Sequence, residues 1–516
     1  MYAFRWFSGL SLGGRILVLI GGLFALACVF FAEENWRGRH AWEASRGQME
    51  AKGVVLDWQK FIPPTVPDDQ NFAMTPFLAP LFDFNPKPRP PGQAMWRDME
   101  GHDRAINFAA SLLAKDNQGQ LPHEQFDGKV IDLEAAVSLV QSNRSPATVP
   151  MFSTRAEAAS ALLAALEEYR PVLEELRDAS RKPYSRFNIE YDAEDPFSIL
   201  LPHYIVLHRV SRVLEMRASA ELALGKTDVA FEDVKLTYWL AQATKDEPFM
   251  IGVQSRGSIM KRAEQVIWEG LAGRAWTEAQ LQQLQALVAG FTVLKDLERG
   301  LSAERAGFGE AAFRYMRSNK NSLRNWMAAD EAAASLWPLL AGPSGWLSQE
   351  QVAYHRLYDL RVMTGFDADA GRVYPQKIEE SKRALERELE GSSLWHHTGF
   401  SKLILPFLMK AFQPAAAGQN RVNQTITACA LERYRVANGK YPEKLDLLVP
   451  RFVEKAPMDV CDGQPLKYQV LQDGHFLLYS VGWNEKDDAG LLVVNKDGSA
   501  IDPNQGDWPW PAYAQK

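Results

Sequence analysis

The sequence lacks the short motifs that mark the common catalytic and nucleotide-binding sites. It has no H-E-x-x-H zinc motif, no G-x-S-x-G nucleophile turn, no P-loop and no C-x-x-C pair. It also lacks an excess of basic residues, because 57 Lys and Arg stand against 64 Asp and Glu, which gives a formal net charge of -7. Binding along a nucleic-acid backbone needs concentrated positive charge, so no nucleic-acid partner is expected.

Cysteine is scarce, with 3 residues in the whole chain. Cys28 lies in an apolar run, which leaves Cys429 and Cys461 for the rest of the protein. Two interpretations are open for this pair: one disulfide, or two buried thiols that behave as small apolar residues. The second is favoured, because separation along the chain says nothing about proximity in space.

One long apolar run lies near the N-terminus. Residues 16–32 carry no charge and are about as long as the hydrocarbon layer of a bilayer requires. Arg5 and Arg15 precede the run, whereas Glu33 and Glu34 follow it, so the positive-inside rule places the N-terminus in the cytoplasm. We expect a single-pass protein of the inner (cytoplasmic) membrane whose bulk is periplasmic or otherwise extracytoplasmic.

Two other interpretations of this run are open. Ala25 and Ala27 form an A-x-A-like signal-peptidase site, but the apolar run continues beyond it through Phe31. Cys28 suggests lipid attachment, yet the residues before it fit a lipoprotein signal poorly. An uncleaved membrane anchor is favoured over both.

Length and composition predict several folded units in a mainly α-helical protein. A chain of 516 residues exceeds what one hydrophobic core usually organises, and 46% hydrophobic with 23% charged residues is ordinary for globular proteins. We expect five segments: a cytoplasmic N-terminus (1–15), a transmembrane helix (16–32), a proline-rich linker or wrapping segment (33–104), an antiparallel α-helical domain (105–397), and a long helix with an α+β domain (398–516).

The proline-rich segment excludes a long helix or a central strand. Nine prolines occur between positions 63 and 91, and each removes a backbone donor. The segment either holds the body away from the membrane as a semi-rigid spacer or packs on the body through aromatic residues such as Phe72, Phe77 and Phe82.

Apolar residues recur at helical spacing between positions 105 and 314. Thr277 and Gln280 form a capping-box pattern, which predicts a helix that begins near Glu278. A Leu-Gly turn at Gly225 joins two amphipathic stretches and resembles one tetratricopeptide-type hairpin, but no second copy follows at a period of about 34 residues. A plain helical hairpin is therefore favoured over a peptide-binding repeat.

The C-terminal region changes character. A long helix is predicted to end at Gly439, and a short helix to follow from Glu443 to Leu448. Residues 457–468 and 475–482 have the pattern of turn-linked strands. The expected fold class is mainly α, with an α+β domain and a small antiparallel sheet at this end.

Three motifs follow one another between positions 434 and 482: Y-R-x-x-N-G-x-Y-P, P-x-D-x-x-x-G-x-P-L-x-Y and L-Y-S-x-G. In this order they resemble the globular head of the type II secretion major pseudopilins, over the last fifth of the chain. The preceding part is similar to uncharacterised membrane-anchored bacterial proteins with the same tail. A pseudopilin carries its apolar helix directly before the head, whereas the apolar run here lies far upstream, so the resemblance implies a head that is reused as an interaction module.

The same resemblance implies a calcium site in the loop after the strands. Asn484, Asp487 and Asp488 would present oxygen ligands to the hard cation, and Asp497 or Asp502 would complete the set. The glycine-rich spacing of the pseudopilin loop is missing, so a solvated turn is the alternative.

No local pattern assigns a catalytic residue. His203 and His208 are five positions apart, and His396 and His397 are adjacent, so neither pair shares one helix face as a metal clamp would. Surface or helix-end histidines are the favoured interpretation. The glutamates between positions 167 and 175 are expected to form exposed ion pairs on a helix.

Two functions are open. The favoured one is a membrane-anchored extracytoplasmic scaffold that binds another protein of the cell envelope, as part of an envelope or secretion-related assembly. The alternative is an extracytoplasmic hydrolase, because carboxylates assembled from distant positions leave no local trace in the sequence. A deep cavity with converging acidic or histidine side chains would favour the hydrolase, and a shallow apolar groove would favour the scaffold.

Overall fold

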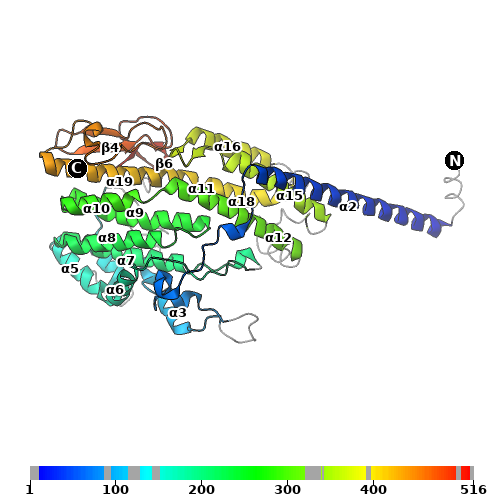
Figure 1. Ribbon diagram of the computed structural model, residues 1–516, viewed down its shortest axis with the longest axis horizontal. Helices are drawn as coiled ribbons and strands as arrows, with labels where there is room; N and C mark the ends of the chain where they lie inside the picture. Colours follow the sequence, from blue (N-terminus) through cyan, green and yellow to red (C-terminus); the bar gives the residue numbers. More distant parts are fainter. Residues whose placement is uncertain are drawn as a thin grey trace.

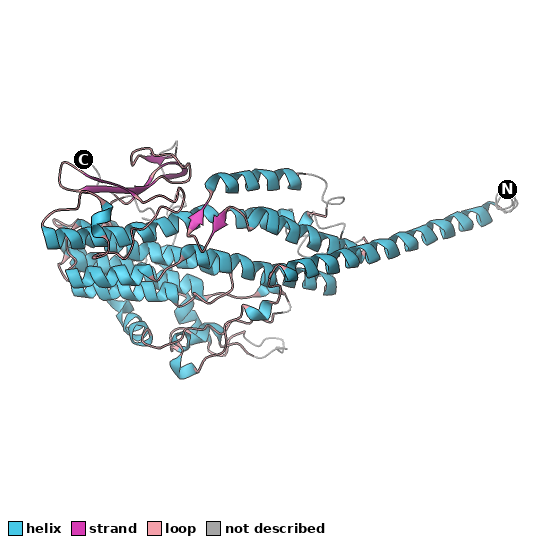
Figure 2. Cartoon of the chain, turned by 45° about the horizontal axis from the view of Figure 1, so that its top comes forward, coloured by secondary structure: helices cyan, strands magenta, loops and turns pink. Residues whose placement is uncertain are grey.

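The fold is taken from a computed structural model, which describes residues 11–85, 95–113, 128–141, 151–193, 195–319, 339, 342–390, 397–495 and 501–511. Helices account for 63% of the structure and strands for 7%. This confirms the expected class, mainly α with small antiparallel sheets near the C-terminus. The body is a stack of helices from which one long helix projects (Figures 1 and 2).

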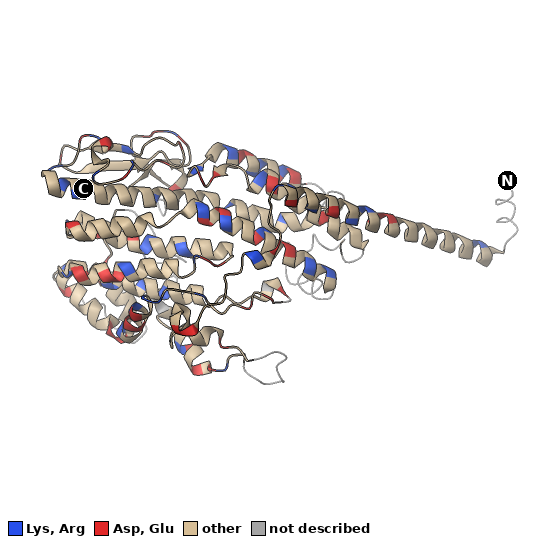
Figure 3. Cartoon of the chain, viewed as in Figure 1, with Lys and Arg blue, Asp and Glu red and all other residues tan. Residues whose placement is uncertain are grey.

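The projecting helix, α2 (Leu12–Ala51), contains the apolar run and continues well beyond it. Ser11 caps its start, since the Ser11 Oγ accepts a hydrogen bond from the Gly14 amide at 3.3 Å. Among the described residues, α2 is the one helix long and apolar enough to cross a membrane, with a mean hydropathy of 2.5 over 18 residues. Figure 3 shows almost no charge on its outer part and many charges near the body.

The second half of α2 lies against α15 (Ser344–Leu357). The two helices meet at glycines, because a Cβ placed on Gly38 would lie 2.1 Å from the carbonyl oxygen of Gly345. Close to this crossing, Asn35 Oδ1 accepts hydrogen bonds from the Gly345 amide at 2.8 Å and from Ser344 Oγ at 2.9 Å. The helix α2 is therefore docked on the body through direct backbone contact.

Short 3₁₀ turns replace long helices where prolines are frequent. They are η1 (Trp58–Lys60), η2 (Asp68–Gln70), η3 (Phe72–Met74) and η4 (Ala79–Phe82), followed by α3 (Met99–Ile106) and η5 (Ala110–Leu113). Phe72, Phe77, Leu78 and Leu81 are buried. This part of the chain thus packs on the body, and the prolines at positions 86 to 91 lie outside the described residues.

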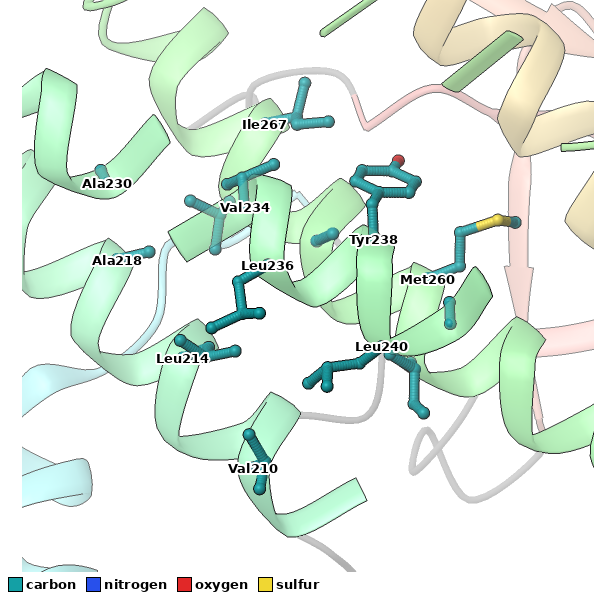
Figure 4. Packing of buried hydrophobic residues seen from close by; sticks show 14 of the residues in the cluster. Val210, Leu214, Ala218, Ala230, Val234, Leu236, Tyr238, Leu240, Met260 and Ile267 are labelled. Atoms are coloured by element: carbon teal, nitrogen blue, oxygen red, sulfur yellow. The ribbon is translucent and has the colours of Figure 1, made fainter. Parts of the chain in front are cut away.

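Antiparallel helices form the main stack (Figure 1). They are α4 (Leu133–Gln141), α5 (Arg155–Leu166), α6 (Arg170–Ala179), α7 (His203–Ala223), α8 (Thr227–Gln242), α9 (Met250–Ala272), α10 (Glu278–Ala289) and α11 (Val293–Glu304), with the turns η6 (Glu167–Tyr169) and η7 (Pro196–Ser198). Figure 4 shows the centre of this stack, where Leu214, Val234 and Ile267 lie among buried apolar side chains. The capping box of Thr277 and Gln280 is complete and α10 begins at Glu278, as predicted.

A second group of helices lies at the end of the body from which α2 projects (Figure 1). Here α11 continues into the π-helical turn η8 (Arg305–Gly309) and α12 (Glu310–Ser318), and α15 continues into a second π-helical turn, η10 (Tyr358–Val362). The strands β1 (Phe366–Asp367) and β2 (Arg372–Val373), α16 (Pro375–Leu389) and α18 (Gly399–Met409) follow. This group has its own apolar core, which includes Phe313, Tyr354 and Phe400.

The C-terminal region begins with α19 (Phe412–Asn438), which ends as predicted at Gly439 in the left-handed conformation, with φ 78°. The short helix η11 (Leu445–Leu448) begins two residues later than expected. Two antiparallel sheets follow, one in the order β3 (Lys467–Val470), β4 (Phe476–Ser480), β7 (Trp508–Pro509), the other from β5 (Leu492–Val494) and β6 (Ile501–Gly506). In the first sheet Lys467 pairs with Tyr479 and Ser480 with Trp508.

The C-terminal region shares its core with the helical stack. Val422, Leu431 and Leu478 belong to the same apolar cluster as the residues of α7 to α10. Cys429 is buried there and Cys461 in the second apolar core, both as free thiols, and burial raises the pKa of Cys429 to about 12. The interpretation of these two residues as small apolar side chains is therefore confirmed.

Candidate functional site

A cavity of about 1150 Å³ lies where the inner end of α2 meets the body. Its walls come from α2 and the residues after it up to Lys60, the loop at positions 191 to 201, the start of α9, the η8–α12 segment and one residue of α18. Such a volume slightly exceeds the usual range for small-molecule sites, about 300–1,000 Å³. Several acidic side chains and several aromatic rings line it.

Glu304, the last residue of α11, contributes a carboxyl group to the wall. Its Oε2 accepts a hydrogen bond from the Met250 amide at 3.2 Å, and no salt bridge joins it to a basic side chain within the described ranges. Burial disfavours the charged form and raises the pKa of Glu304 to about 7, against the smaller opposing effect of the Met250 hydrogen bond. At neutral pH this carboxyl is therefore available in its protonated form.

Three other buried carboxyls also have a pKa near 7, but they face partners inside the protein. Asp233 contacts Arg177 and Arg217, and Glu264 contacts Arg421. Glu350 accepts the amides of Gly399 and Phe400 at the start of α18, each at 3.0 Å. Glu304 differs because it borders the cavity.

Glu310, the first residue of α12, lines the same cavity in the opposite electrostatic setting. Its Oε1 lies 2.6 Å from His355 Nε2, and Gln351 Nε2 donates to Oε1 and Oε2 at 2.8 and 2.9 Å. Arg317 in turn donates to the Gln351 Oε1. Burial by itself would raise the pKa of Glu310, but the hydrogen bond and the attraction from His355, with Gln351 and Arg317, outweigh it and lower the pKa.

The tautomer of His355 follows from a second contact. Arg305 Nε donates to His355 Nδ1 at 2.8 Å, so Nδ1 is unprotonated and Nε2 carries the proton that points to Glu310. Burial, the largest cause, lowers the pKa of His355 below 6.5. Arg305 is held by Asp359, whose Oδ1 lies 2.6 Å from Nη1. Glu310 is thus an ionised carboxylate supported by a neutral imidazole.

The turn between the two glutamates is the π-helix η8, whose backbone hydrogen bonds span five residues instead of the four of the flanking α-helices. Its glycines allow close packing, because a Cβ on Gly307 would lie 2.2 Å from the Trp58 ring and one on Gly309 would lie 2.8 Å from Tyr354 Oη. π-Helical turns are often found at functional sites.

Aromatic rings cover the side of the cavity near Glu304. Tyr191 and Phe249 are stacked with ring centroids 5.9 Å apart and planes 4° apart, and Trp58 contacts both rings. Tyr191 is 7% exposed, and its hydroxyl is buried without a hydrogen-bond partner in the described part of the chain. Burial raises the pKa of Tyr191. A buried hydroxyl beside a cavity is a ready partner for a polar ligand group.

The structure places the histidines chosen from the sequence elsewhere. His203 Nε2 lies 3.0 Å from Glu247 Oε2. His203 is the first residue of α7 and is fully buried, so the helix-end alternative of the prediction is confirmed for this residue and the surface alternative is wrong. His208 contacts Ser255 Oγ at 3.1 Å, and His396 lies outside the described residues. The histidine that contacts Glu310, His355, was missed because no short-range spacing connects it to its partners.

The glutamates near position 170 form exposed ion pairs, as expected. Arg170 lies 2.6 Å from Glu167 and 3.5 Å from Glu174, with all three side chains more than half exposed. Glu175 instead accepts a hydrogen bond from the Phe77 amide at 2.8 Å. None of these residues lines the cavity.

The residues predicted to bind calcium lie in one loop of the C-terminal region. Asn484 Nδ2 donates to Asp488 Oδ2 at 2.9 Å, whereas Asp487 Oδ1 accepts from Tyr479 Oη at 2.9 Å. Asp497 lies outside the described residues. Within the ranges that the structure describes, no three His, Cys, Asp or Glu side chains are grouped as a metal site. The calcium site, including the part of Asp502, stays a prediction.

A residue missed by the sequence reasoning, Asp507, organises this loop. Its Oδ1 accepts the Asp488 amide at 3.2 Å and its Oδ2 accepts the Gly490 amide at 2.5 Å. The Asp507 carboxylate, directly before β7, therefore holds the loop by accepting hydrogen bonds from two backbone amides.

The chain was compared with protein-family models, curated proteins and solved structures. No family model, no curated protein and no solved structure matches it. Functional arguments therefore rest on the geometry of the cavity.

Proposed function

We propose that this protein is a membrane-anchored extracytoplasmic hydrolase that uses Glu304 and Glu310 as a pair of acid and base. The observation that carries the proposal is the opposite ionisation of two glutamates in one cavity, with the pKa of Glu304 raised to about 7 and that of Glu310 lowered. Environments that separate the pKa values of two carboxyls are typical of acid–base pairs in hydrolases.

The residues suit a hydrolytic step on a neutral substrate. Glu310, as the ionised carboxylate, takes a proton from a water molecule whose oxygen forms the new bond to the substrate. Glu304, as the carboxylic acid, gives its proton to the oxygen or nitrogen that leaves as the old bond breaks. Exchange of one proton through water then restores both groups. The rings of Tyr191 and Phe249 would contact apolar parts of the substrate, and the Tyr191 hydroxyl would bond to a polar group.

The protonation states can be tested without a known substrate. Dicyclohexylcarbodiimide reacts with protonated carboxyls in apolar surroundings, and mass spectrometry locates the adduct. We expect labelling of Glu304 that declines with a midpoint near pH 7, and far less labelling of Glu310 at the same pH. Glu304→Gln is the control for the site of reaction. Equal labelling of both residues, or labelling of Glu304 that is the same from about pH 6 to about pH 8, would overturn the proposal.

A panel of neutral esters, amides and glycosides then tests activity. Glu304→Gln and Glu310→Gln should each lower the turnover of any substrate found by on the order of 10²-fold or more. Wild-type activity should fall as the pH rises through about 7, because Glu304 then loses its proton. Loss of activity on the acidic side alone would contradict these roles.

The placement of the body outside the cytoplasm is part of the proposal. It is supported by the apolar half of α2 and by the basic residues before that half, with Glu33 and Glu34 after it. Alkaline phosphatase fused after Lys516 should be active in the inner membrane of a bacterial host. An inactive fusion with normal expression would reverse the orientation.

The scaffold is a second candidate, favoured by exposed apolar residues in the C-terminal region. Leu491, Leu492 and Val494, in and before β5, are 59%, 37% and 50% exposed, as expected for a docking surface of a pseudopilin-like head. Crosslinking in the native membrane, with Leu492→Ser and Val494→Ser as the test variant, would identify envelope partners lost with this surface. Removal of residues 418–516 is a poorer test than these two substitutions, because the deletion also removes residues of α19 from the core of the helical stack. An unchanged set of partners would leave this candidate without support.

A further inference from the structure

The inner end of the anchor helix contacts the residues that hold Glu310. The Trp42 ring is stacked on the His355 ring, with centroids 5.3 Å apart and planes 26° apart. About two turns later, Met49 Sδ accepts a hydrogen bond from Arg305 Nη2 at 2.9 Å. Arg46 and Glu50, from the same stretch of α2, line the cavity, and Arg46 Nε donates to Glu50 Oε1 at 2.8 Å.

His355 is fully buried, and its charged neighbours come from several elements. Arg305 of η8 faces Nδ1, Glu310 of α12 faces Nε2, and Asp359 of η10 acts through Arg305. On the side of α2, the uncharged Trp42 covers the imidazole ring. Arg46 and Glu50 form an ion pair at the edge of the cavity, so their charges neutralise each other. Removal of Trp42 would therefore open His355 to water on the side of α2.

We infer that α2 is a working part of the site, in which Trp42 acts as a positioning residue that keeps the His355 imidazole uncharged and hydrogen-bonded to Glu310. Trp42 itself is not among the residues that line the cavity. Its effect reaches the cavity through His355, whose orientation fixes the carboxylate of Glu310. The inference rests on the proposed function, because Glu310 is the group that takes the proton there.

The docking of α2 supports this role. Between the apolar run and Trp42 the helix is held by Gly38 at Gly345, and by Glu34 Oε2, which accepts from Trp346 Nε1 at 3.1 Å and from Gln349 Nε2 at 2.9 Å. Trp42 follows position 32 by ten residues, about 15 Å along a continuous helix. Because the helix is continuous, Trp42 lies at a fixed distance from the apolar run that is proposed to cross the membrane.

The test follows the protonation of His355 in the full-length protein in lipid nanodiscs. The chain has 9 histidines. Selective ¹³C labelling of the His Cε1 atoms, with His355→Asn to assign the resonance, gives its pKa. We expect the pKa of His355 in the wild type to lie below the ordinary 6.5 and to rise toward that value in Trp42→Ala. Trp42→Phe, which keeps an aromatic ring over the imidazole, should restore most of the wild-type value.

Trp36→Ala is the matched control. Trp36 is 61% exposed on the same helix and stacks on His40, with centroids 5.1 Å apart, so its removal should leave the His355 resonance unchanged. If Trp42→Ala does not fold, Trp42→Leu replaces it, and we expect a smaller rise in the pKa of His355. An unchanged pKa of His355 in a folded Trp42→Ala or Trp42→Leu protein would overturn the inference.

The two proposals fail in different ways. Carbodiimide labelling of Glu304 reports on the acid of the proposed pair and does not involve His355. Normal pH-dependent labelling of Glu304 with an unresponsive His355 would remove the role of the anchor and keep the proposed function. A rise in the His355 pKa without selective labelling of Glu304 would keep the coupling to α2 and remove the proposed chemistry.

Discussion

The two walls of the cavity hold the same side chain in opposite states. On one wall, Glu304 is half-buried near aromatic rings with a single amide donor, and its pKa rises to about 7. On the other, Glu310 receives hydrogen bonds from His355 and Gln351, and its pKa falls. Burial alone pushes both groups toward the neutral form, so the number of donors decides which of them remains charged.

The walls also differ in what supports them. Glu310, on α12, is supported by α15 and α2, whereas Glu304 is supported by α9 and lies near the loop around Tyr191. A perturbation of α2 should therefore reach one glutamate and spare the other. The predictions below test this difference, beginning with the largest effect.

The helix crossing at Gly38 gives the largest expected change. Gly38→Ala places a Cβ 2.1 Å from a backbone oxygen that cannot move alone, so we expect a loss of about 4 kcal/mol in the free energy of unfolding. Gly47→Ala on the same helix meets nothing within 4 Å and should stabilise by about 0.5–1 kcal/mol. Urea unfolding in detergent measures both. Similar effects of the two variants would show that α2 is not docked at this crossing.

Glu304→Gln should stabilise the protein at neutral and alkaline pH. The folded pKa of Glu304, about 7, exceeds the ordinary value of 4.5, so the stability of the wild type falls as pH rises from 4.5 through 7, while Gln does not titrate. The advantage of the variant should reach about 3 kcal/mol above pH 7 and disappear at low pH. Urea unfolding at several pH values gives the curve, and a flat difference would contradict the assigned pKa.

Glu310→Gln should change stability in the other direction. It removes the charged acceptor of His355 and Gln351, so we expect a loss of about 2 kcal/mol at neutral pH. Because the folded pKa of Glu310 lies below 4.5, this contribution is present above pH 4.5 and is lost as the pH falls through the folded pKa. The same unfolding series applies. If Glu310→Gln instead gained stability, as expected for Glu304→Gln, the opposite ionisation of the two glutamates would be contradicted.

The smallest expected effect concerns the carboxylates of the C-terminal loop that are predicted to bind calcium. If calcium binds there, millimolar CaCl₂ should raise the thermal midpoint by about 1–2 °C, and Asp488→Asn should remove the rise. Asp473→Asn, in the turn between β3 and β4, is the control that should keep it. No calcium-dependent shift in the wild type would exclude the predicted site.

Elements defined by neighbouring residues were predictable. The apolar run became the outer part of α2, the capping box of Thr277 started α10, and Gly439 ended α19. Boundaries that depend on packing were harder to predict. The transmembrane helix was expected to end at position 32, but α2 extends to Ala51 along α15, and η11 begins at Leu445 instead of Glu443. In both cases contacts with distant segments decided where the element begins or ends.

The candidate site was not predictable in the same way. The sequence reasoning anticipated that dispersed carboxylates leave no motif, but it did not select Glu304, Glu310 or His355. Met250 and Glu304 are 54 positions apart, and Glu310 and His355 are 45 apart. Trp42 lies on the anchor helix, whose apolar half gave no reason to connect it with a cavity.

The sequence by itself determined the apolar run, the helical class and the local helix signals, because hydrophobic length, periodicity and capping depend on residues a few positions apart. Only the tertiary structure decided the protonation of the cavity. The charge on a carboxyl depends on its distance from water and on the donors that face it, and for Glu304 and Glu310 these are supplied by helices far apart in the chain.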